Sequence, residues 1–302
     1  MDKLIKMKTS TQVIDRRNGK VFEEKIFGEK FVRWAHETSL GLFITASPKI
    51  QKLASKVYGT YCSSSLSRGE IPRFLAEHAI QMEDFAEPDG GFANFNEFFS
   101  RHLKSGARTF ASGPGDVASP AEGRVLYSPI VRGKASLVIK GKSYEVGGLI
   151  GENDVGDLAH AYVVRLCPVD YHRYHYAVSG KVVKTMDLGG KLFSVNPMAL
   201  NLRNNVFWEN YRQVYKLETL DKRTCYQVEV GAICVGSMTQ TKKLGDSFKA
   251  GDEKGTFLFG GSTCILLLPK AFVPDGDIVQ NSARGFETYV KVGEALGRFV
   301  ST

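Results

Sequence analysis

The pattern of apolar and polar positions changes about one third of the way along the chain. Between residues 29 and 82 apolar side chains such as Phe31, Trp34 and Leu42 recur at helical spacing. After residues 112–115 short runs rich in β-branched and aromatic residues alternate with Gly and Asn turns. We therefore predict an α+β fold, in which N-terminal amphipathic helices precede a β-rich body of mostly antiparallel sheets.

The individual elements follow from the same pattern. Residues 71–82 predict a helix with Pro72 in its first turn, and residues 92–103 predict a shorter one. Strands are expected at 124–131, 136–139, 161–166, 181–186, 225–230, 233–238 and 264–268. Residues 285–299 are typical of a strand followed by a short helix. The loop Glu-Pro-Asp-Gly-Gly at residues 87–91 marks a boundary between a helical region, 1–90, and the β-rich body, 91–302.

Composition indicates an ordinary globular protein with a basic surface. Of the 302 residues, 43% are hydrophobic and 24% are charged, and the formal net charge is +8. Such a charge favours an anionic partner, nucleic acid or an acidic membrane, although it also fits a protein that is merely soluble. Basic residues are scattered and match no nucleic-acid-binding motif, so we expect no nucleic acid partner. Since no apolar run is long enough, we expect neither a signal peptide nor a spanning helix.

Cysteine and histidine are used sparingly. The five cysteines form no Cys-x-x-Cys pair, which argues against a disulfide framework and favours a reducing compartment. Only His172 and His175 are close together in sequence, and no thiol accompanies them at metal-ligand spacing. We therefore predict no metal site.

One tripeptide, Gly261-Ser262-Thr263, stands between two apolar runs. Glycine lacks a Cβ atom and lets another group approach the backbone closely. Ser262 could thus attack the carbonyl group of Gly261 and cut its own chain. The alternative interpretation of this segment is a β-bulge or a strand kink.

Two further segments supply the groups that activate a hydroxyl. Asp-Tyr-His-Arg-Tyr-His at residues 170–175 contains an imidazole, and Pro-Ala-Glu-Gly at residues 120–123 places the carboxylate of Glu122 in a turn. We predict that His172 is the base for Ser262 and that Glu122 accepts a hydrogen bond from the far nitrogen of the imidazole ring. His175 is the second histidine candidate, or else a packing residue.

These three segments resemble the phosphatidylserine decarboxylase family, which carries Gly-Ser-Thr, Asp-Tyr-His-Arg-x-His and Pro-Ala-Asp-Gly motifs. Further matches lie at residues 95–99, 193–197 and 230–237, so the resemblance extends from about residue 90 to the C-terminus. The doubled glycine before Ser262 is similar to one branch of the family. Glu122 departs from the usual Asp by one methylene group.

The resemblance implies a self-processing zymogen in phospholipid biosynthesis. Cleavage between Gly261 and Ser262, assisted by Thr263, leaves two associated fragments and a pyruvoyl group made from Ser262. The ketone of this cofactor forms a Schiff base with phosphatidylserine, which loses CO2 to give phosphatidylethanolamine, with His172 or His175 as the proton donor. Three arginines are candidates for binding the anionic headgroup: Arg101, Arg173 and Arg212.

The resemblance also implies a location. The enzyme is expected to be peripheral on the cytoplasmic side of an anionic membrane, with Trp34, Leu42 and Phe43 in the N-terminal region as interfacial anchors. The apolar stripes of that region equally fit a protein core. A homodimer is a further possibility.

Three other functions remain open from the sequence. A serine hydrolase could use Ser262, His172 and Glu122 on an external ester, although the Gly-x-Ser-x-Gly elbow is absent. A related pyruvoyl enzyme could decarboxylate a free amino acid. A β-rich binding module could have lost self-processing through the change to Glu122.

Overall fold

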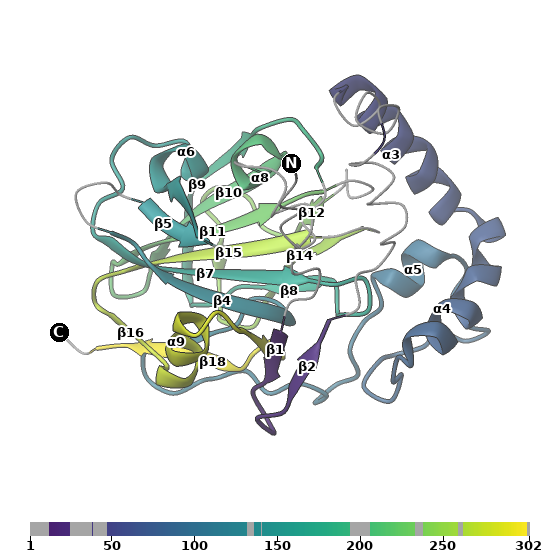
Figure 1. Cartoon of the computed structure of the whole chain (residues 1–302), viewed down its shortest axis with the longest axis horizontal. Coiled ribbons are helices and arrows are strands. Elements are labelled where there is room, and N and C mark those ends of the chain that lie inside the picture. The colour runs from purple at the N-terminus through teal and green to yellow at the C-terminus, as the bar shows by residue number, and fades with distance from the viewer. Residues whose placement is uncertain are drawn as a thin grey trace, which may run out of the picture.

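The structure, a computed structural model, describes residues 12–24, 38, 47–131, 136–139, 141–193, 206–232, 238–258 and 262–300. Helices α3 (Pro48–Cys62), α4 (Glu70–His78) and α5 (Phe95–Phe99) gather on one side of a β-rich body, on the right in Figure 1. The predicted α+β fold with mostly antiparallel sheets is confirmed.

A ten-stranded sheet forms the centre of the body. Its strands, in spatial order, are β13 (Ser247–Phe248), β9 (Gly180–Leu188), β10 (Arg212–Thr219), β11 (Thr224–Val230), β15 (Ser262–Pro269), β7 (Leu158–Leu166), β4 (Gly123–Pro129), β17 (Glu287–Val290), β1 (Gln12–Asp15) and β2 (Val21–Glu23). All neighbours are antiparallel except β1 and β17.

Strand β15 is buried along its whole length because apolar cores cover both faces of the sheet. Its side chains alternate between the two cores, with Cys264 and Leu266 in one and Ile265 and Leu267 in the other. Ser262, at the start of β15, is therefore held on the side of Cys264.

Smaller elements complete the body. The further sheets are β12 (Met238–Gln240), β14 (Glu253–Phe257) and β8 (Arg173–His175); β16 (Phe272–Pro274), β18 (Ala295–Phe299) and β3 (Asp116–Ala118); and β5 (Ser136–Ile139) with β6 (Lys142–Glu145). The remaining described helices are α6 (Val146–Ile150), α8 (Val206–Glu209), α9 (Gly276–Ala283) and a 3-10 helix at Ser65–Gly69.

The helix α5 is fixed beside the body by a cluster of aromatic side chains. The side chain of Asn94 caps its first turn by accepting a hydrogen bond from the backbone N–H of Glu97, at 3.0 Å. Phe95, Phe98 and Phe99 are buried in one apolar cluster with residues of α4. These three aromatic residues belong to the core.

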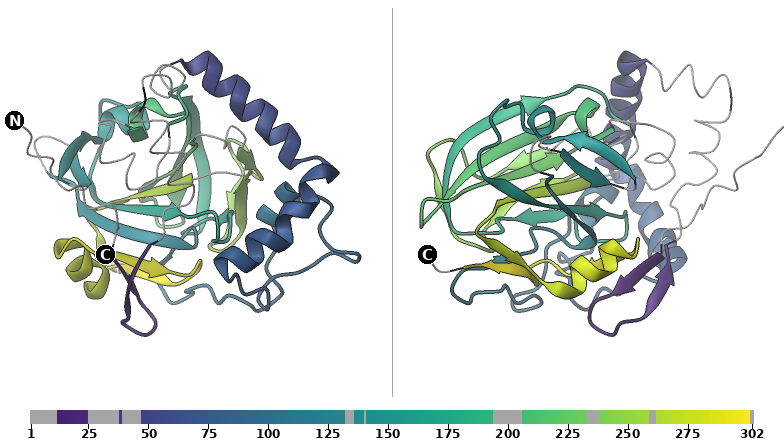
Figure 2. Two further views of the ribbon diagram at one scale, coloured as in Figure 1. Left: turned by 45° about the vertical axis from the view of Figure 1, so that its right-hand side comes forward. Right: turned by 60° about the vertical axis from the view of Figure 1, so that its left-hand side comes forward.

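Two parts of the prediction are wrong. Residues 12–24 do not belong to a helical region: they form the strand pair β1–β2, the purple hairpin at the bottom of both views in Figure 2. The edge of β17 supplies hydrogen-bond partners for β1, and Val13 and Ile14 become buried there. At the C-terminus, residues 295–299 form strand β18 rather than a helix, because they pair with β16 and β3.

Other expectations fall partly outside the described residues. Residues 233–237 of one predicted strand are among these, and so are the proposed anchors Trp34, Leu42 and Phe43. Within the described ranges, no helix has the length and apolar character needed to span a membrane.

Candidate active site

The structure brings Ser262 and His172 together. Ser262 is the first residue of β15, and His172 lies in the connection between β7 and β8. Ser262 Oγ is 3.5 Å from His172 Nδ1, and both side chains are fully buried. The distance is at the long limit of a hydrogen bond, as is common for a nucleophile and its base before reaction.

The second ring nitrogen determines the tautomer of His172. Its Nε2 lies 2.9 Å from the carbonyl oxygen of Cys167, which can only accept a hydrogen bond. Nε2 therefore carries the hydrogen, and Nδ1 presents a free electron pair to the hydroxyl of Ser262. This is the protonation state that a general base requires.

The surroundings of His172 keep its ring neutral. Burial and the positive charge of Arg101 lower the pKa of His172 to about 3. The ring of Phe99 stacks on the imidazole, with centroids 3.8 Å apart and an angle of 22°. At neutral pH the imidazole can thus accept a proton from Ser262.

A tight turn holds the Cys167 carbonyl in place. The backbone N–H of Asp170 donates to that carbonyl at 2.9 Å, and the backbone N–H of Cys167 donates to Asp170 Oδ2 at 2.6 Å. The carboxylate of Asp170 also forms an ion pair with buried Arg124. The orientation of His172 consequently depends on Asp170, the first residue of the Asp-Tyr-His motif.

The predicted hydrogen bond between Glu122 and His172 is wrong. Glu122 instead accepts hydrogen bonds from Arg108 Nε at 2.8 Å and from the hydroxyl of Tyr289 at 3.2 Å. Arg108 is buried, and a buried guanidinium group needs an anionic partner. Glu122 therefore neutralises Arg108, while a main-chain oxygen takes the place expected for Glu122 at the ring.

His175 lies on strand β8, and its ring nitrogens have partners other than Ser262. Its Nδ1 donates to the carbonyl oxygen of Gly251 at 2.9 Å, so its Nε2 accepts from the hydroxyl of Tyr171 at 3.1 Å. Burial lowers the pKa of His175. Both ring nitrogens thus have partners within the described residues, which agrees with the alternative of a packing residue.

Thr263 follows Ser262 and points to the opposite face of the sheet by strand alternation. Its Oγ1 is buried and, in the described part of the chain, has no hydrogen-bond partner. Gly261, on the other side of the predicted cleavage bond, lies outside the described residues.

Two of the three candidate arginines lie close to His172. Arg101 is only 1% exposed and donates to the carbonyl groups of Val169 and Asp170, while Arg173 pairs with Glu253 at 2.6 Å. Both line a cavity of about 350 Å³ beside α5. Arg212 does not line this cavity and instead donates to carbonyl groups of α6.

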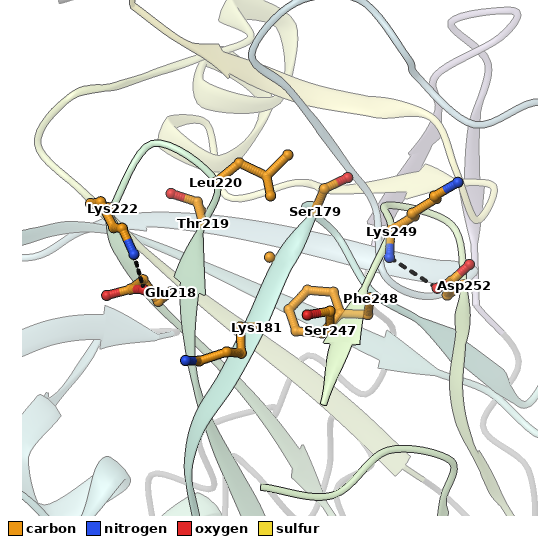
Figure 3. A pocket seen from close by; sticks show the side chains of 11 residues that line it. Ser179, Lys181, Glu218, Thr219, Leu220, Lys222, Ser247, Phe248, Lys249 and Asp252 are labelled. Atoms are coloured by element: carbon orange, nitrogen blue, oxygen red, sulfur yellow. Dashed lines mark hydrogen bonds and ion pairs between the residues drawn. The ribbon is translucent and has the colours of Figure 1, made fainter. Parts of the chain in front are cut away.

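A larger cavity, of about 770 Å³, lies on β9, β10 and β13 (Figure 3). Its lining includes Lys181, Leu220 and Phe248 but none of the predicted catalytic residues. The Ser262–His172 pair is therefore not part of this cavity. No group of three or more potential metal ligands occurs among the residues that the structure describes.

Sequence reasoning missed three contributors to the site. The Cys167 carbonyl and the ring of Phe99 both contact His172, and Arg124 holds Asp170. Of these three, only Phe99 carried a signal, because it lies in the matched segment 95–99.

A buried serine beside a neutral, oriented histidine is an arrangement in which a hydroxyl group can act as a nucleophile. The profile of the family described as phosphatidylserine decarboxylase matches residues 95–298. The chain therefore belongs to the phosphatidylserine decarboxylase family, as its motifs predict, and is an enzyme of the decarboxylase class.

Known relatives are similar over nearly the whole chain. The phosphatidylserine decarboxylase proenzyme of Chlamydia pneumoniae is 38% identical over 291 residues, which cover 95% of this chain and 97% of the relative. The proenzymes of Clostridium botulinum (strain 657 / Type Ba4) and Clostridium beijerinckii are each 36% identical. These two alignments cover 94% and 95% of this chain and 97% and 98% of the relatives.

Proposed function

We propose that this chain is a precursor that cuts itself between Gly261 and Ser262 and then converts phosphatidylserine into phosphatidylethanolamine and CO2. The observation that supports self-cleavage is the contact of 3.5 Å between Ser262 Oγ and the unprotonated Nδ1 of His172. The names of the relatives support the substrate and the precursor form.

Self-cleavage begins when His172 Nδ1 takes the hydroxyl proton of Ser262. The Oγ atom then bonds to the carbonyl carbon of Gly261, and the bond from that carbon to the nitrogen of Ser262 breaks. The nitrogen takes the proton back from His172, which leaves an ester, a free amine and a neutral imidazole. Loss of the Cα proton of Ser262 expels the Gly261 carboxylate and gives a dehydroalanine. Its imine tautomer reacts with water, releases ammonia and leaves a pyruvoyl group at position 262.

The residues around position 262 fit such a group. His172 Nδ1 lies beside position 262, and the neighbouring Thr263 has a buried Oγ1 without a hydrogen-bond partner among the described residues, on the opposite face of β15. A pyruvoyl group supplies an electrophilic carbonyl that takes up the electron pair released when CO2 leaves. Thr263 would help to hold this end of β15, and His172 would return a proton to the α-carbon of the substrate, with His175 as the second candidate.

The fold also supports a stable complex of the two fragments. Both β15 and β17 follow the cleavage site, yet β15 lies between β11 and β7, and β17 lies between β4 and β1. The C-terminal fragment is therefore inserted at two places among strands of the N-terminal fragment. A homodimer of this complex stays a prediction.

We further propose that α3 docks on an anionic membrane surface, with the enzyme peripheral on the cytoplasmic side. Leu53 and Val57 are 64% and 63% exposed, and Ile50 and Tyr61 continue the same helical stripe. The buried residues Ser55 and Cys62 lie on the other side of the helix. Exposed Lys49 and Lys56 flank the stripe, which suits a layer of acidic lipid headgroups.

Two features count against the alternative functions. A hydrolase that keeps its chain intact needs a nucleophile that is accessible in the uncut chain, where Ser262 is fully buried. An enzyme for a free amino acid has no need of the exposed apolar stripe on α3.

The decisive experiment is intact-mass spectrometry of the purified protein and its variants. We expect two fragments that separate after Gly261, with a keto group at the N-terminal end of the smaller one. Ser262→Ala and His172→Ala should each give one intact chain without decarboxylase activity. His175→Ala is the matched control and should still be cut. An active wild-type protein with an intact bond at 261–262 would refute the proposal.

A further inference from the structure

The N-terminal strand pair carries a carboxylate into the interior of the body. Glu24 directly follows β2 and is 8% exposed. Arg165 donates to Glu24 through both terminal nitrogens, one of them at 3.1 Å, and Arg124 Nε lies 3.4 Å from Glu24 Oε1. Burial disfavours the charge on Glu24, but the two arginines outweigh it and lower the pKa of this carboxyl to about 2.

The cluster of Glu24, Arg124 and Arg165 is also connected to the catalytic histidine. Arg124 forms an ion pair with Asp170, and Asp170 Oδ2 holds the backbone N–H of Cys167 at 2.6 Å. The carbonyl of Cys167 in turn orients His172. The thiol of Cys167 also contacts Glu24 directly. Glu24 is therefore connected to both the side chain and the backbone of the turn that sets the tautomer of His172.

We propose that Glu24 is a positioning residue for self-cleavage and that the β1–β2 strand pair is an intramolecular activator of the Ser262–His172 pair. This inference rests on the proposed function. Arg165 has a further carboxylate partner, Glu287 at 2.6 Å. The carboxylates of Asp170 and Glu24 are the ones that pair with Arg124 among the described residues. Without the charge of Glu24, Arg124 and Arg165 are incompletely neutralised in the interior, and the Asp170 turn loses its fixed geometry.

Glu24→Gln removes this charge with little change in shape. We expect the first-order rate of conversion from precursor to fragments to fall on the order of ten- to a hundredfold, since small displacements of a base have such effects. Glu24→Asp keeps the charge and should recover part of the rate. The matched control is Glu23→Gln, which removes the same charge from the exposed neighbouring residue of β2, outside the buried cluster.

A second readout separates positioning from folding. In uncleavable Ser262→Ala protein, nitrogen NMR of His172 should show a hydrogen on Nε2, and adding Glu24→Gln should increase the population with a hydrogen on Nδ1. Wild-type rate and an unchanged tautomer in the Glu24→Gln variant would overturn the inference, as would equal slowing by Glu23→Gln. Failure of the wild-type chain to be cut at all would instead refute the proposed function.

Discussion

The imidazole of His172 is oriented by the main chain of Cys167, whose carbonyl oxygen lies 2.9 Å from Nε2. A carboxylate at this position would stabilise the protonated ring, whereas a carbonyl oxygen does so more weakly. The ring is moreover buried against Phe99 and close to positively charged Arg101. The site is thus arranged to keep His172 neutral, as the proposed role of base for Ser262 requires.

The pH dependence of self-cleavage follows from this arrangement. A base works only when unprotonated, and the pKa of His172 is lowered from 6.5 to about 3. We expect the cleavage rate to show no inflection near the usual histidine pKa and to fall only in strong acid. Freshly synthesised precursor, followed on denaturing gels between about pH 5 and pH 8, tests this. A half-maximal rate near pH 6.5 would contradict it.

The lowered pKa of His172 also makes the stability of the folded protein depend on pH in a defined direction. The unfolded chain binds a proton at His172 near its ordinary pKa of 6.5, while the folded protein does so only near 3. This contribution to stability is therefore complete above pH 6.5 and is lost as the pH falls toward 3.

Replacing Phe99 by Ala should raise the pKa of His172. Loss of the stacked ring admits water to His172, reduces the penalty for its charged form and raises its pKa toward 6.5. We expect slower cleavage and a new inflection in the rate profile at mildly acidic pH. Phe92→Ala is the control, since Phe92 packs in the same cluster against Phe98. An identical profile for both variants would show that the stacking does not tune His172.

The sequence predicts a strand well where the apolar pattern lies within the strand itself, and poorly where the strand depends on a partner far away in the chain. Strands β7 and β15 were located from continuous apolar runs, and both are buried on both faces. Strand β1 has four residues and follows a polar segment, so its periodicity carries little information. It exists because β17, from the other end of the chain, offers a free edge. Such non-local pairing is not visible in a local pattern.

The candidate site shows the same difference between features that a local sequence pattern reveals and features that it does not. The motifs predicted that Ser262 and His172 form a pair, and the structure brings the two side chains together. The partner of His172 is a backbone oxygen, which any residue type at position 167 would provide. The assignment of Glu122 to that position failed because buried Arg108 competes for the carboxylate.

Glu122→Gln should therefore act on stability through Arg108. Measured by denaturant unfolding in the Ser262→Ala background, where cleavage does not interfere, we expect a loss of about 1.5–3 kcal/mol. Asp84 contacts the same guanidinium group at 2.6 Å but is 42% exposed, so Asp84→Asn should cost less than about 1 kcal/mol. Equal losses in the two variants would contradict the assignment of Glu122 as the principal partner of Arg108.

The exposed stripe on α3 leads to a prediction about membrane binding. Glutamate at position 53 or 57 places a negative charge in the centre of the apolar stripe, so Leu53→Glu and Val57→Glu should each weaken binding to vesicles that contain phosphatidylserine. Cosedimentation with such vesicles, compared with vesicles of neutral lipid, measures the effect. The control is Val138→Glu, because Val138 is 46% exposed on β5, away from α3. Self-cleavage should be unchanged in all three variants, since none of these side chains contacts the Ser262–His172 pair. If Val138→Glu reduced binding as strongly as the α3 variants, net charge and not the stripe would determine docking.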